Sequence, residues 1–302
     1  MREYPSRILT GAKTMFKKLR SARGAAVDWR VALALPLTYY IASVLALMAH
    51  EIGHGAVSKL IGGQFTGWYL APGVVGWSRP YGDVPLPQLT IIWITAGGTL
   101  GEGILGGLML IVALYSRHRW RNWTPVALAL GGTCLLTLAG ANLAANALLG
   151  WGDGYALVHW GVSPVIPVGL GILAVMLFGW VQLPFTVEML DPYLRVEREV
   201  EVWSIIMAAG LPVMIYSLVK SYLLFAQHFS RYTVYLPAFV LVSGIGATLA
   251  GQRKRLKHPK SGLPVRRISS VTIAILSLLA LAAEIGCTVY FGLDQTLKPP
   301  PF

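Results

Sequence analysis

Hydrophobic residues occupy this chain in long stretches that short polar segments separate. A stretch of about 20 such residues can cross a bilayer. Each crossing segment is expected to be helical, because lipid offers no hydrogen-bond partner to an open backbone. About seven stretches qualify, at 31–61, 88–115, 124–148, 162–182, 202–226, 235–250 and 268–291. The pattern therefore predicts an all-α, multi-pass membrane protein without a cleavable signal peptide.

The composition supports the same class of protein. Apolar residues make up 55% of the 302 residues and charged residues only 13%, and the mean hydropathy is +0.60. A soluble domain carries about 25% charged residues to cover its surface. Disordered chains and small disulfide scaffolds are excluded as well, because apolar content is high and only two cysteines are present.

Positive charge is concentrated in alternate segments between the predicted helices. The net charge is +12, and most lysines and arginines lie in 1–30, 116–123, 183–201 and 251–267. Cytoplasmic segments of membrane proteins are enriched in these residues. We therefore expect a cytoplasmic N-terminus, an exoplasmic C-terminus and no nucleic-acid partner. The N-terminal segment either lies on anionic lipid or is simply solvated.

The end of the first predicted helix holds three ionisable residues, His50, Glu51 and His54. Residues four apart share one helix face, so the two histidines can bind one metal ion. Glu51 is then placed to take a proton from a metal-activated water and return it to a leaving amine. Burying such residues in a membrane is costly, which favours a catalytic zinc site over a structural role.

A catalytic zinc site normally has three protein ligands and one open position. The candidates for the third ligand are Asp153, His159, Glu102 and Glu284. The first and third predicted helices both run outward, which places Asp153 at the depth of His54. The alternative is that the Gly-Asp-Gly at 152–154 is an ordinary turn.

Three segments together resemble the core helices of a known family. They are HEIGHGA at 50–56 followed by IGG at 61–63, AGGTLG at 96–101, and Asn146 with the Asp-Gly pair at 153–154. Over about residues 40–160 the chain resembles the site-2 proteases, which are membrane-embedded zinc metallopeptidases. The resemblance implies that Asp153 is the third zinc ligand. It also implies that the substrates are membrane proteins or peptides cut within or beside the bilayer.

The chain departs from the family pattern in three respects. Gly150-Trp151-Gly152 stands where the family has prolines, and no loop is long enough for a soluble regulatory domain. The charge bias also places the metal near the outer face rather than near the cytosol. The expected organisation is a basic segment 1–30, a three-helix zinc peptidase core 31–160, and accessory helices 161–302 with a basic loop 251–267.

The segment 62–87 combines aromatic residues with glycines and prolines, which predicts short hairpins at the membrane interface. An exposed strand edge there, including Phe65 and Tyr69, could pair with an unwound substrate. An anchoring loop is the alternative. Asn146 either contacts the substrate or assists at the oxyanion, or it bridges helices.

Two further polar features lie within predicted spans. Glu102, among glycines of the second helix, either makes a structural hydrogen bond, which we slightly favour, or orients a ligating histidine. Glu284 and Lys220 lie at similar depths, which favours an interhelical ion pair. The alternative is that each of these side chains turns toward water.

The preferred function is an intramembrane zinc metalloprotease, and two alternatives belong to other classes. A metal-binding transporter would need polar residues through the depth of several helices, and the later helices supply only Lys220 and Glu284. A non-catalytic subunit of a larger membrane assembly is the other alternative, although the intact HExxH motif argues against lost chemistry.

Overall fold

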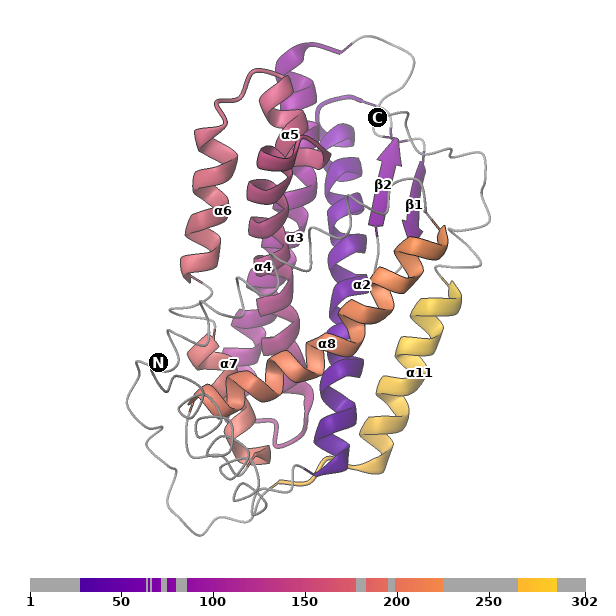
Figure 1. The fold of residues 1–302 in the computed structure, drawn as a ribbon, viewed down its shortest axis with the longest axis vertical. Coiled ribbons are helices and arrows are strands. Elements are labelled where there is room, and N and C mark those ends of the chain that lie inside the picture. The colour runs from indigo at the N-terminus through magenta and orange to yellow at the C-terminus, as the bar shows by residue number, and fades with distance from the viewer. Residues whose placement is uncertain are drawn as a thin grey trace, which may run out of the picture.

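The computed structural model describes residues 28–63, 65, 67–71, 75–79, 86–177, 183–194, 199–224 and 266–286. The predicted span 235–250 and most of the basic segments 1–30 and 251–267 lie outside the described residues. The part that is described is mostly helical, as the hydrophobic pattern predicts (Figure 1).

Three long helices form the centre of the fold: α2 (Trp29–Leu60), α3 (Gln88–Ser116) and α4 (Thr124–Leu149). Among the described residues, these are the helices long and apolar enough to cross a membrane. They match the first three predicted spans closely. α3 packs against both α2 and α4, and the chain alternates direction along the three helices (Figure 1).

Glycines set the separation of these helices. A Cβ atom added to Gly53 of α2 would collide with the backbone of Gly97 on α3, and one added to Gly101 would collide with the backbone of Ala49. Small residues four apart allow this close approach between membrane helices. As a result, the α3 backbone passes directly beside the HExxH segment of α2.

Two glycines in the left-handed region reverse the chain after α4. Gly150 ends α4 with a φ of 76°, and Gly152 follows with a φ of 67°. A short helix, α5 (Gly152–His159), begins at once and packs against α4. Asp153 therefore lies in the first turn of a helix rather than in an ordinary turn, and the helix carries it back toward α2.

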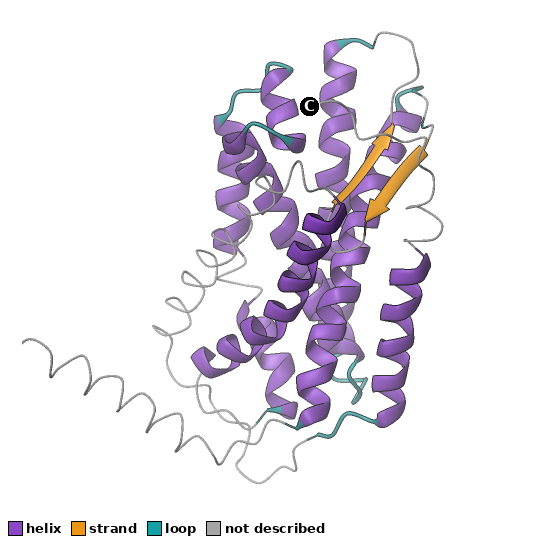
Figure 2. Ribbon diagram, turned by 45° about the vertical axis from the view of Figure 1, so that its right-hand side comes forward, coloured by secondary structure: helices purple, strands orange, loops and turns teal. Residues whose placement is uncertain are grey.

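The segment after α2 forms an antiparallel pair of strands, β1 (Gly67–Ala71) and β2 (Val75–Arg79). Gly67 is paired with Arg79 and Ala71 with Val75. The hairpin lies beside α2 near the end of the bundle that also carries α5 (Figure 2).

The later part of the chain forms shorter or less uniformly apolar helices. These are α6 (Val165–Leu177), α7 (Leu183–Leu190), the 3₁₀ helix η3 (Asp191–Tyr193), α8 (Glu199–Leu224) and α11 (Ser270–Gly286). The interpretation of 183–201 as a loop is wrong for its first part, because α7 buries Thr186 and Leu190 and packs against α4. The apolar stretches of α6, α8 and α11 are each shorter than a full span.

A polar junction ties α8 and α11 to α2. The Lys220 ammonium of α8 donates to a carboxylate oxygen of Glu284 on α11 over 2.6 Å. Tyr40 of α2 donates its hydroxyl to the other oxygen of the same carboxylate. The predicted interhelical ion pair is therefore confirmed, and it is anchored on the helix that carries the HExxH motif.

Candidate metal centre

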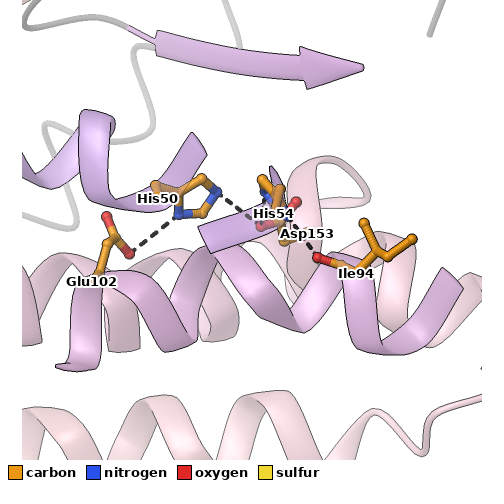
Figure 3. Close-up of polar contacts among 5 residues, drawn as sticks. All are labelled: His50, His54, Ile94, Glu102 and Asp153. Carbon is orange, nitrogen blue, oxygen red and sulfur yellow. Dashed lines mark hydrogen bonds and ion pairs between the residues drawn. The ribbon is translucent and has the colours of Figure 1, made fainter. Parts of the chain in front are cut away.

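His50, His54 and Asp153 form the group of described residues that could hold a metal ion. The histidines lie one turn apart on α2, and Asp153 reaches them from the first turn of α5 (Figure 3). One potential ligand atom from each residue lies within 4.8 Å of the other two.

The separations fit a single small ion. Oδ2 of Asp153 lies 2.9 Å from Nε2 of His50 and 3.2 Å from Nε2 of His54. Two tetrahedral zinc ligands at ordinary bond lengths stand about 3.3 Å apart. The two separations from Asp153 to the histidine nitrogens are therefore close to the spacing of two zinc ligands.

The other ring nitrogens of the histidines face α3. Nδ1 of His54 lies 2.7 Å from the carbonyl oxygen of Ile94, and because a carbonyl can only accept, Nδ1 is the donor. Nδ1 of His50 lies 3.3 Å from Oε2 of Glu102. Metal-ligating histidines characteristically place their second nitrogen against a carbonyl or a carboxylate in this way.

This arrangement brings electron-rich atoms together. A neutral imidazole protonated at Nδ1 presents a lone pair at Nε2, and here both Nε2 atoms face a carboxylate. Burial raises the pKa of Asp153, but positive charge on the imidazoles of His54 and His50, when these are protonated, outweighs that effect and holds the pKa below its usual value. The group is stable only with positive charge at its centre, supplied either by protons on the histidines or by a cation.

Gly98 of α3 lies beside the ligand atoms of both histidines. A Cβ atom added there would lie 2.6 Å from Nε2 of His54 and 2.7 Å from Nε2 of His50. α3 thus presents bare backbone to the ligand atoms, and the absence of a side chain leaves the space between them open.

Glu51 follows His50 on α2 and is 1% exposed. Its carboxylate is close enough to His54 to interact with it electrostatically. Glu51 is not one of the three residues that could ligate an ion. Its carboxylate is therefore not required for metal coordination.

The structure separates the candidates for the third ligand. Asp153 joins the histidine pair, whereas Glu102 faces the opposite ring nitrogen of His50. Glu284 is held by Lys220 and Tyr40. His159, in the last turn of α5, is exposed and lies edge-to-face with the Trp160 ring.

The residues predicted to meet substrate are placed as follows. Asn146 is buried, and its backbone oxygen accepts from the amides of Gly150 and Trp151 at the turn before Asp153. The Phe65 ring packs against Gly55 of α2. Tyr69 is paired with Trp77 in the hairpin register, and its side chain lies outside the described part of the structure.

Two groups that lie against the ligand histidines were not predicted from the sequence. The carbonyl of Ile94 has no sequence signal, because every residue carries one and only the fold selects it. Gly98 had a weak signal in the small-residue run 96–101, which indicated close packing but not contact with the histidines.

The centre is therefore built from elements far apart in the chain, with α3 supporting ligands from α2 and α5. Comparisons with models of protein families, with curated proteins and with solved structures found no match.

Proposed function

We propose that this chain is a multi-pass membrane metalloprotease of the site-2 protease type. It would hold one zinc ion through His50, His54 and Asp153 and hydrolyse peptide bonds of membrane-associated substrates. The lipid bilayer is its environment, and membrane proteins or peptides are its substrates.

The observation that carries the proposal is that the two nitrogens of each histidine ring face different groups. Each Nδ1 faces an acceptor on α3, and each Nε2 faces Asp153. Imidazole and carboxylate are ordinary zinc ligands, and three of them with one open position is the catalytic pattern. Gly98 supports an open position because it adds no side chain beside the ligand atoms.

The reaction divides between the ion and Glu51. Bound zinc would supply the Lewis acidity that activates a water molecule and polarises a peptide carbonyl. The Glu51 carboxylate would accept a proton from the attacking water and deliver it to the nitrogen of the leaving amine. Asn146 would assist from the side of the substrate.

The distribution of charge supports an orientation in the membrane. Six of the nine lysines and arginines among the described residues lie at one end of the bundle, where α2 and α11 begin and α3 ends: Arg30, Arg117, Arg119, Arg121, Arg266 and Arg267 (Figure 1). The other three are Lys59 in the last turn of α2, Arg79 at the end of β2 and Lys220 within α8. The metal group lies toward the other end, beside α5. Because cytoplasmic ends are enriched in lysine and arginine, we propose a cytoplasmic N-terminus and a metal site near the exoplasmic face.

Replacement of Glu51 tests the catalytic assignment. Glu51→Gln in purified full-length protein should keep zinc and lose peptide hydrolysis by about 100-fold or more, because the general base is removed. Glu188→Gln makes the same chemical change at an exposed glutamate of α7 and should leave hydrolysis intact. Hydrolysis that survives Glu51→Gln would contradict the assigned base.

The same preparations separate the rival functions. Zinc flux into liposomes without hydrolysis would favour a transporter. A chain that holds no zinc and purifies in fixed stoichiometry with other membrane proteins would favour a structural subunit. The protease proposal requires zinc and hydrolysis together.

A further inference from the structure

Glu102 is the only acidic residue of α3 and is 1% exposed. An ionisable residue in the middle of an apolar helix costs about 3 kcal/mol to insert in a membrane. Glu102 is not one of the three residues that could ligate the ion. We therefore expect Glu102 to interact with a polar partner that offsets this cost.

That partner is the outward-facing nitrogen of His50. Oε2 of Glu102 lies 3.3 Å from Nδ1 of His50. Both atoms are buried, and neither is hydrogen-bonded to any group in the described residues, so the 3.3 Å approach is an ion-pair contact. Two buried polar atoms that face each other, with no competing partner, define a specific pair.

The pair belongs to a row of three positions on α3. Ile94, Gly98 and Glu102 are four residues apart, so they follow one another along one side of the helix. Ile94 accepts from His54, and Glu102 faces His50 (Figure 3). Between them, Gly98 places no side chain beside the ligand atoms. Because α2 and α3 run in opposite directions, each histidine meets its own acceptor.

We propose that Glu102 is a positioning residue that orients His50 for metal binding, an inference that rests on the proposed metal centre. Its carboxyl fixes the proton of His50 on Nδ1, so that Nε2 presents its lone pair toward Asp153. A carboxylate that accepts from Nδ1 also makes Nε2 more basic than a carbonyl in the same place would, and the imidazole is then a stronger metal ligand. Glu102 does not touch the ion or the substrate.

The experiment measures zinc affinity by competition with a chromophoric chelator, using full-length protein stripped of metal. Glu102→Leu removes the acceptor and should weaken zinc binding about 10- to 100-fold. Glu102→Gln retains an acceptor oxygen and should recover most of the affinity. Glu284→Leu removes another intramembrane carboxylate, away from the ligand group, and should leave zinc affinity unchanged.

Two further measurements keep the test decisive if Glu102→Leu does not fold. Glu102→Asp keeps the charge but shortens the side chain by one methylene, so it should lose affinity as Glu102→Leu does. The visible spectrum of the cobalt-substituted protein should change in Glu102→Asp, because the shorter side chain no longer orients the His50 imidazole. It should remain close to that of the wild type in Glu102→Gln, which keeps the acceptor oxygen.

The outcomes distinguish the two proposals. Unchanged zinc affinity and an unchanged cobalt spectrum in Glu102→Leu or Glu102→Asp would overturn the role of Glu102 and leave the metal centre standing. A wild-type protein that binds neither zinc nor cobalt would overturn the metal centre itself, and the positioning role with it.

Discussion

Gly98 of α3 lies directly against His54, so closely that an added Cβ atom would stand 2.6 Å from Nε2. The same atom would stand 2.7 Å from Nε2 of His50. The close packing of α2 and α3 through Gly53 and Gly97 produces this contact. The small-residue run on α3 therefore has two effects: it brings the helices together, and it leaves the ligand atoms uncovered.

Gly98→Ala should weaken metal binding without removing a ligand. The new methyl group would enter the space between the imidazoles, and overpacking of about 1–3 kcal/mol corresponds to roughly tenfold or more in affinity. Zinc competition on purified protein measures the loss. Gly107→Ala on the same helix meets nothing within 4 Å and should bind zinc normally. Normal zinc binding by Gly98→Ala would show that the ion does not lie where we place it.

Asp153→Ala should weaken zinc binding by more than the roughly 10- to 100-fold that loss of an outer partner costs, because a direct ligand is lost. His159→Ala, at the other end of α5, should have no effect, since that imidazole is exposed and outside the ligand group. Metal analysis after dialysis and zinc competition provide the readout. Should the two variants behave in the opposite way, His159 would replace Asp153 as the third ligand.

The sequence predicts the local part of this centre and not the part that depends on packing. The spacing of His50 and His54 indicates a shared metal because four residues make about one helical turn. Asp153 is harder, because its approach depends on the reversal at Gly150 and Gly152. The depth of Asp153 in the membrane could be inferred from the directions of the helices. The side from which Asp153 reaches the histidines could not.

The sequence offered Glu102 as a possible partner of a ligating histidine, but the contacts that α3 makes with the two histidines depend on packing. The Ile94 carbonyl becomes a partner of His54 only when two helices cross at one register. The contact of Glu102 with His50 depends on the same register, which is why the sequence slightly favoured a structural hydrogen bond. The 183–194 segment was misjudged for a related reason, because the burial of Thr186 and Leu190 against α4 is a tertiary effect.

The Lys220–Glu284 pair should contribute to stability but not to metal binding. Lys220→Met leaves a carboxylate of the bundle short of a donor, which should lower the free energy of unfolding by about 1–3 kcal/mol. The double variant with Glu284→Gln should lose less than the sum of the two single variants, because they share one interaction.

Denaturant or thermal unfolding in detergent measures this coupling, and zinc affinity serves as the control. Affinity should not change in either single variant, because the pair is outside the ligand group. Strictly additive losses would mean that the 2.6 Å contact has no energetic weight.

The most direct test is the metal content and X-ray absorption spectrum of the purified full-length protein. We expect one zinc ion per chain, with nitrogen and oxygen ligands and the scattering signature of two imidazoles. In His54→Ala the ion should be lost or the signature reduced to one imidazole. A chain without bound metal, or a bound ion whose spectrum is the same in His54→Ala, would contradict the account.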